Sequence, residues 1–180
     1  MGPHKIVEKG ELSNNYNEEE VRNYMKNEEG LRKVRTLIDE QKTVMMASNL
    51  NTIPFSVCPM TVQQMDEKGD LWFFVSKDSG LFKDIEEDNR VQIIYNDDNK
   101  QQYLSIFGNA THIIAEQKKE ELWNHHLLNW FEGKDDPDLT LISVNMENAF
   151  FWDNENSKLV PFFEAGESNV SSSEKGFVNL

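Results

Sequence analysis

Two serines and a lysine stand where an apolar run ends and a short helix is expected to begin. The run LWFFVS (71–76) ends in Ser76 and is followed by Lys77, with Ser79 two residues further on. Ser79 is a good N-cap, and the free N–H groups at a helix N-terminus bind anions. The serines add hydroxyl donors, while Lys77 and Lys83 add positive charge. These residues suit a phosphate group, and a helix cap that holds no ligand would explain them too.

Other side chains that often carry chemistry stand alone in the sequence. His125 and His126 are adjacent, so on a helix they would diverge by about 100° and could not bind one metal ion. His112 lies in an alternating strand pattern, which predicts a position on a barrel surface. Cys58 has no visible base or helix dipole to activate its thiol. We therefore expect neither a metal site nor a nucleophilic cysteine.

Charge and composition restrict the possible partners. The 180 residues include 32 acidic and 18 basic side chains, which gives a net charge of −14. This balance argues against nucleic acid and against an anionic membrane surface, because both need clustered Lys and Arg. No apolar stretch approaches the roughly 18 residues of a membrane span, and the N-terminus has no signal-peptide core. With one cysteine, the chain is expected to be cytoplasmic.

Hydrophobic spacing predicts two helices between polar ends, and the N-cap at Ser79 predicts a third. Residues 1–16 read as a flexible leader, and 164–180 as a flexible polar tail. Apolar residues recur at three- and four-residue spacing from Asn17 to about Glu40, and again over about 116–131. The third helix is the short one that follows Ser79, over about 80–87.

Short β-type runs separated by turn residues fill most of the remaining chain. They lie at 43–50, 56–63, 71–76, 90–95, 103–114, 139–146 and 149–153, with a weaker run at 158–163. Gly108 is the natural position for a bulge or a barrel corner. Because there is no βαβ alternation, we predict a mainly β (α+β) domain over 17–163, built as a small antiparallel barrel with helices packed outside it.

Three segments, taken together, resemble a known family. They are PFSVCPMTVQQMDEKGDLWFFVSKDSGLFKDIEEDNRVQIIY, then YLSIFG, then ELWNHHLLNWFEGKDDPDLTLISVNMENAFFWD. In this order and spacing they resemble the general stress protein 26 family of pyridoxamine 5′-phosphate oxidase-like, flavin-binding split barrels. The resemblance covers about residues 30–153. It implies a six-stranded antiparallel split β-barrel with flanking helices, which forms a homodimer with a flavin groove at the interface.

The resemblance also implies a set of cofactor-binding residues drawn from both subunits. The set is Cys58, Pro59, Met60, Thr61, Phe74, Ser76, Lys77, Ser79, Leu81, Trp123 and Trp152. The strand from Pro59 to Thr61 would run beside the isoalloxazine ring, with Phe74 and Ser76 on the next strand. Ser79 would stand at the phosphate end. Trp123 and Trp152 would come from the partner subunit.

Two positions depart from the family pattern. Cys58 stands where the family often carries Arg, and Leu81 stands where it often carries Lys. Both cations would be expected around the cofactor phosphate, and each charge-assisted hydrogen bond is worth about 1.5–3 kcal/mol. Lys77 or Lys83 could replace part of this charge.

Two functions follow as alternatives. The first is an FMN- or FAD-binding stress protein that acts as an oxidoreductase, in which the cofactor carries the chemistry and no side chain need act as acid or base. The second is a non-catalytic dimer that has lost flavin and serves a binding or structural role. Pyridoxamine-phosphate oxidation itself is disfavoured because it needs a second basic phosphate site, and Arg90 is the only arginine after Arg35.

Overall fold

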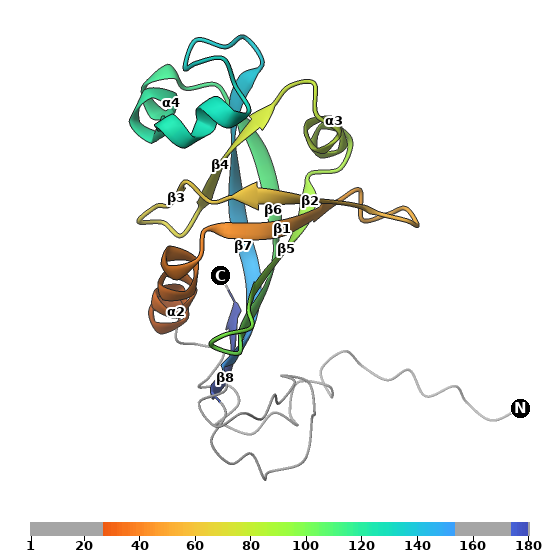
Figure 1. The fold of residues 1–180 in the computed structure, drawn as a ribbon. Helices are drawn as coiled ribbons and strands as arrows, with labels where there is room; N and C mark the ends of the chain where they lie inside the picture. The colour runs from red at the N-terminus through yellow and green to blue at the C-terminus, as the bar shows by residue number, and fades with distance from the viewer. Residues whose placement is uncertain (1–26, 154–173, 180) are drawn as a thin grey trace, which may run out of the picture.

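The computed structural model describes residues 27–153 and 174–179, which form a curled antiparallel sheet with helices against it (Figure 1). The strands are β1 Thr43–Ser48, β2 Ser56–Thr61, β3 Gln64–Met65, β4 Leu71–Ser76, β5 Arg90–Asp97, β6 Gln102–Ile113, β7 Leu139–Asp153 and β8 Glu174–Asn179. The helices are α2 Asn27–Glu40, α3 Gly80–Glu87 and α4 Glu116–Leu122, with the 3₁₀ helix η1 His125–Asn129.

Seven strands follow one another in the order β2-β1-β5-β6-β7-β4-β3, and β8 pairs with β7 beside this path. The sheet curls into a half-barrel, which brings β2 into contact with β4 although the two do not pair. The expected mainly β, antiparallel fold is confirmed. The expected count of six strands is wrong, because the two-residue β3 and the C-terminal β8 also join the sheet.

β7 corrects the prediction of two closing strands at 139–146 and 149–153. It runs unbroken from Leu139 to Asp153. The polar pair Glu147–Asn148 resembles a turn in the sequence, but the register shows a bulge: Gly108 pairs with Met146 and Phe107 with Asn148, so Glu147 has no opposite residue. The bulge expected at Gly108 is therefore present, and its extra residue lies on β7.

The helix expected over 116–131 is two shorter helices. Trp123 ends α4, and Asn124 adopts an extended backbone before η1 begins. The Asn124 side chain accepts a hydrogen bond from the His126 backbone N–H at 3.2 Å. This local cap competes with helix continuation, as Asn side chains commonly do. Leu122, Trp123, Leu127 and Phe131 of the predicted apolar stripe pack in one cluster, whereas Trp130 is 69% exposed.

The other predicted segments have mixed outcomes. α2 matches the described part of the helix expected over 17–40, and α3 matches the short helix after Ser79. Within the polar segment 164–180, the structure has strand β8 at Glu174–Asn179. The leader 1–16, the start of the first helix and the weak run 158–163 lie outside the described residues.

Side chains on the two faces of the sheet form two separate apolar clusters. The main cluster fills the curl of the sheet and includes the buried residues Met46, Phe73, Ile93 and Ile106. A smaller cluster lies on the outer face of β4 and β7 beneath α4 and η1; its buried members are Phe74, Leu127, Leu139 and Leu141. Because strand side chains alternate, Phe73 and its neighbour Phe74 enter different clusters.

Candidate functional site

β2 is an edge strand, and four of its six residues are exposed. Cys58 and Met60 face the interior and pack against the main cluster, while Pro59 and Thr61 are exposed on the outer face. β1 is the strand that pairs with β2 along its length. The outer face of β2 therefore presents Pro59 and Thr61, and not Cys58 or Met60, to a ligand lying on that face.

The turn after β4 is built by its own serines. The Ser79 hydroxyl donates to the Ser76 carbonyl at 2.7 Å and accepts from the Phe82 backbone N–H at 3.1 Å. The Ser76 hydroxyl oxygen accepts from the Asp78 backbone N–H at 3.2 Å. The expected N-cap role of Ser79 is thus confirmed, and it engages both hydrogen-bonding functions of that hydroxyl. Ser76 keeps its hydroxyl hydrogen available for a further acceptor.

The start of α3 is open to solvent. A Cβ placed on Gly80 would meet no atom within 4 Å, and Gly80 itself is exposed. The first N–H groups of a helix have no partner inside the helix. Lys77 is exposed beside this turn, and its backbone N–H donates to the Asp138 carbonyl at 2.9 Å. In the described part of the chain, the Lys77 ammonium forms no ion pair. The turn can therefore offer an anion backbone N–H groups, one hydroxyl and one cation.

Leu81 does not face this open end. Only 6% of it is exposed, and it packs in the main cluster with Phe82 and Ile85. An apolar residue is what this position requires in this chain. A leucine at this position therefore goes with inward packing of the first turn of α3.

Cys58 lies near the carboxylate of Asp84 on α3. Partial burial raises the pKa of the Cys58 thiol, and the negative charge of Asp84 raises it further. Asp84 in turn accepts a hydrogen bond from the Ser48 hydroxyl at 2.8 Å. A thiol held protonated in this way is a poor nucleophile. Asp84 is a neighbour that sequence spacing did not reveal, because it comes from a separate element.

Phe74 on β4 packs against Trp123, the residue that ends α4. Their ring centroids are 6.3 Å apart with an interplanar angle of 82°. Hydrogen bonds hold this cover in place: the Asn124 amide donates to Gln63 Oε1 at 2.9 Å, and Lys118 Nζ donates to Gln64 Oε1 at 2.5 Å. Trp123 therefore contacts the candidate cofactor strand of its own chain.

Trp152 is far from the other candidate residues within one chain. It lies near the C-terminal end of β7, opposite Tyr103, whereas Phe74 pairs with Leu141 near the start of that strand. Eleven residues of extended strand span roughly 36 Å at about 3.3 Å each. The structure thus brings together residues of β2, β4 and the α3 turn, and leaves Trp152 apart from them.

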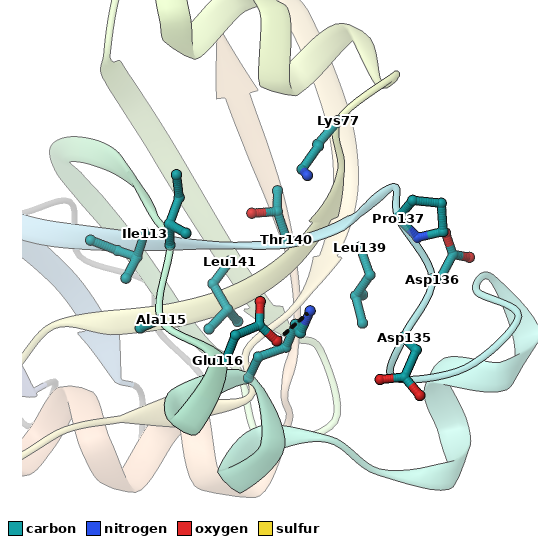
Figure 2. A pocket seen from close by; sticks show the side chains of 12 residues that line it. Lys77, Ile113, Ala115, Glu116, Asp135, Asp136, Pro137, Leu139, Thr140 and Leu141 are labelled. Carbon is teal, nitrogen blue, oxygen red and sulfur yellow. Dashed lines mark ion pairs between the residues drawn. The ribbon is translucent and has the colours of Figure 1, made fainter.

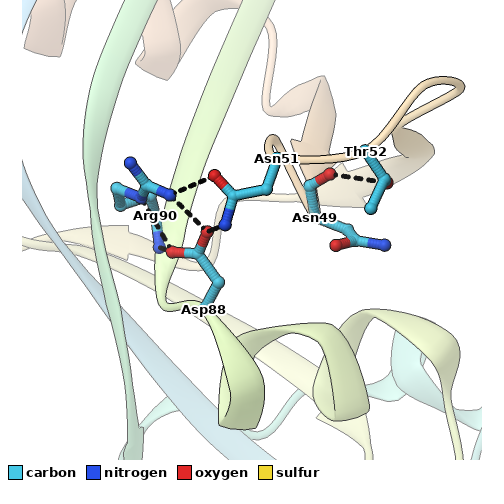
Figure 3. Close-up of polar contacts among 5 residues, drawn as sticks. All are labelled: Asn49, Asn51, Thr52, Asp88 and Arg90. Carbon is cyan, nitrogen blue, oxygen red and sulfur yellow. Dashed lines mark hydrogen bonds and ion pairs between the residues drawn. The ribbon is translucent and has the colours of Figure 1, made fainter.

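Arg90 is engaged elsewhere, as Figure 3 shows. Its Nε donates to Asp88 Oδ1 at 2.8 Å, and the Asn51 amide donates to Asp88 Oδ2 at 2.8 Å. Hydrogen bonds from Arg90 lower the pKa of Asp88 to about 2. This cluster ties the β1–β2 loop to the end of α3. The arginine that a second phosphate site would need is therefore already paired.

The described residues contain neither a membrane-spanning helix nor a cluster of metal ligands. No helix there is long and apolar enough to cross a membrane. Over the same residues, no group of three or more His, Cys, Asp or Glu side chains is placed to hold a metal ion.

A curled antiparallel half-barrel with an open turn at one end of β4 defines a class of fold that known proteins share. The family model described as pyridoxamine 5′-phosphate oxidase like matches residues 29–175. The chain belongs to this family, and the resemblance seen in its motifs is confirmed.

Individual relatives carry the general stress protein 26 name. General stress protein 26 of Bacillus subtilis (strain 168) is 29% identical over 76 residues, which are 41% of this chain and 54% of that protein. The match thus spans about half the length of the curated relative.

Solved structures extend the likeness over more of the chain. The general stress FMN/FAD binding protein from Xanthomonas citri is 27% identical, covers 81% of this chain and 99% of its own, and gives a TM-score of 0.63. A Clostridium acetobutylicum protein related to general stress protein 26 is 22% identical, covers 75% of this chain and 94% of its own, and gives a TM-score of 0.62. The second shows a shared fold.

Proposed function

We propose that this protein binds a flavin nucleotide and acts as a flavin-dependent oxidoreductase of the general stress protein type. The observation that carries the proposal is the turn from Ser76 to Ser79 at the open start of α3, in a chain of this family. The Xanthomonas citri relative, which is an FMN/FAD binding protein, supports it. When bound, the flavin would supply the electron transfer.

The residues present fit the phosphate of such a cofactor. The turn after β4 carries backbone N–H groups at the open start of α3, the Ser76 hydroxyl and the exposed Lys77, all within five consecutive residues. Helix N-termini favour anions through these N–H groups and the helix dipole. Pro59 and Thr61 on β2 and Phe74 on β4 would border the ring. Cys58, Met60 and Leu81 would act from the interior by supporting these strands.

A second copy of the chain would complete the groove. Exposed apolar side chains lie on the outer face of three paired strands: Met45 on β1 is opposite Ile94 on β5, and Val57 lies on the neighbouring β2; each is more than 40% exposed. An apolar surface of this kind marks an interaction site. Trp152 lies on the same face and would reach the cofactor of the partner. The proposed homodimer explains why Trp152 is remote within one chain.

Titration of the purified protein with FMN, followed by quenching of flavin fluorescence, tests the proposal. Lys77→Gln should weaken binding about tenfold or more, since a charge-assisted hydrogen bond is worth about 1.5–3 kcal/mol. Lys68→Gln, at an exposed lysine in the β3–β4 turn, is the matched control and should bind as the unaltered protein does. Equal losses in both variants would place the phosphate elsewhere.

Specific contacts favour a non-catalytic alternative. The Ser79 hydroxyl is fully engaged, Trp123 covers one edge of Phe74, and Leu81 supplies no charge. A dimer that uses its sheet face for binding alone would keep all of these contacts. In that case, neither FMN nor FAD would bind, and the two-subunit assembly would persist without them.

A further inference from the structure

A pocket of about 300 Å³ opens beside Lys77, next to the turn proposed to hold the flavin phosphate (Figure 2). Its walls come from the end of β6 and the start of α4, from the loop before β7, and from the first residues of β7. Ile113 and Ala115 lie on one side, Asp135 and Pro137 on the other, and Leu139 on the floor between them. Ile114 also lines the pocket. None of these residues belongs to the cofactor set that the sequence indicates.

The pocket continues directly from the phosphate turn. Lys77 lines it, and the Lys77 backbone N–H is bonded to Asp138 in the loop that forms the far wall. Its floor residue Leu139 pairs with Ser76 across the β4–β7 ladder. A ligand that placed one phosphate at Ser76 and the start of α3 would have this pocket next to that phosphate. FMN ends at its phosphate, whereas FAD continues with a second phosphate, a ribose and an adenine.

The lining suits those additional groups. Ile114 is 84% exposed at the rim, so an apolar surface is open there to cover a base. The Asp135 carboxylate is exposed and can accept hydrogen bonds from ribose hydroxyls, as acidic residues do in other dinucleotide sites. Lys119 lies in the pocket wall with its ammonium 2.9 Å from Glu116. Lys77 follows Ser76 and also lines the pocket, so it is available to a second phosphate beside the first. The pocket volume of about 300 Å³ is at the lower end of the range for small-molecule sites.

We infer that this pocket holds the adenosine part of FAD, so that the chain selects FAD over FMN. The inference rests on the proposed flavin function and deepens it. Adenine would pack against Ile114 and Ala115, and the ribose would face Asp135. The second phosphate would lie at Lys77.

Parallel titrations of the full chain with FMN and with FAD test this inference, with flavin fluorescence and calorimetry as readouts. FAD should bind about tenfold more tightly than FMN or better. Ala115→Trp, which fills the pocket, and Ile114→Ser, which removes apolar surface at the rim, should each lower FAD affinity toward that of FMN and leave FMN affinity unchanged. Leu128→Ser is the matched control, because Leu128 is also an exposed apolar residue, lies on η1 and does not line the pocket.

Each outcome decides between the two proposals. FMN binding as tightly as FAD, or more tightly, overturns the adenosine pocket and leaves the flavin function standing. An FAD preference that both pocket variants retain overturns the pocket assignment, since the second phosphate alone would then explain the preference. If neither flavin binds, both proposals fail.

Discussion

The Trp123 ring meets the Phe74 ring edge-on, with centroids 6.3 Å apart. Phe74 belongs to β4 and Trp123 closes α4, so this contact fixes the helical cover over the outer face of the candidate cofactor strand. Only 7% of Phe74 is exposed as a result. Whatever binds along β4 must therefore do so beside this aromatic pair.

The pair should contribute measurable coupling to stability. In a double-mutant cycle of Phe74→Leu and Trp123→Leu, followed by urea denaturation, we expect a coupling free energy of about 0.5–1.5 kcal/mol. Trp130→Leu is a matched control, because Trp130 is 69% exposed and its replacement should change the free energy of unfolding by less than about 0.5 kcal/mol. Additive effects at positions 74 and 123 would contradict the packing described.

Cys58 and Leu81 should respond differently to added charge. Leu81→Lys puts an ammonium into the main cluster, so it should destabilise the fold by about 3 kcal/mol or more. Cys58→Arg is half-buried near Asp84, which can pair with the guanidinium, so this variant should stay folded. Thermal denaturation of both variants checks this. A Leu81→Lys protein as stable as the unaltered chain would show that the residue does not pack inside.

Tyr95 carries a buried hydroxyl that lacks a partner in the described structure. Tyr95 is fully buried, and no group accepts or donates a hydrogen bond at its oxygen. Removing such a group removes a desolvation cost of about 1–3 kcal/mol, so Tyr95→Phe should raise the free energy of unfolding. A loss of stability in chemical denaturation would show that the hydroxyl is paired after all.

The same residue predicts a pH effect. Burial, with the charges of Asp97 and Glu40, raises the pKa of Tyr95 to about 12 from an ordinary value of 10.0. Above pH 10 the unfolded chain releases this proton while the folded chain keeps it, so stability is complete below pH 10 and falls as the pH rises toward about 12. Tyr95→Phe should lack this part of the alkaline decline. Parallel denaturation curves across that range would contradict the assignment.

Gly108 should tolerate no side chain. A Cβ there would lie 2.4 Å from the Asn145 carbonyl oxygen, which belongs to the backbone of the paired strand. Gly108→Ala must therefore push β6 and β7 apart at the bulge and should be strongly destabilising. Gly133→Ala is the control, since a Cβ at Gly133 meets no atom within 4 Å. Comparable melting temperatures for the two variants would show that the strands do not approach so closely.

Local chemistry in the sequence was sufficient for most elements of the fold. Alternating apolar runs predicted the long strands, and Ser79 predicted α3, because both signals act within a few residues. The joining of two runs into β7 was not predictable locally, since Glu147 and Asn148 resemble a turn. Only the pairing with β6 shows that one extra residue is absorbed as a bulge. β8 was missed because its polar sequence is ordered by pairing with β7.

Fewer features of the candidate site could be predicted, because most of them join segments that are far apart in the sequence. The Ser76–Ser79 turn is local and could be identified from its residue types. The inward packing of Leu81, the proximity of Asp84 to Cys58 and the contact between Trp123 and Phe74 all join segments distant in sequence. The pocket beside Lys77 likewise combines β6, α4 and β7, so no motif could indicate it.

Flavin binding is the central claim, and the absorption spectrum of the purified protein tests it most directly. After incubation with excess FMN or FAD and removal of free flavin by gel filtration, we expect a visible flavin spectrum that elutes with the protein. The bound flavin should approach about one per chain, as one copy of the proposed phosphate site per chain requires. Protein that elutes colourless after incubation with either flavin would contradict the claim.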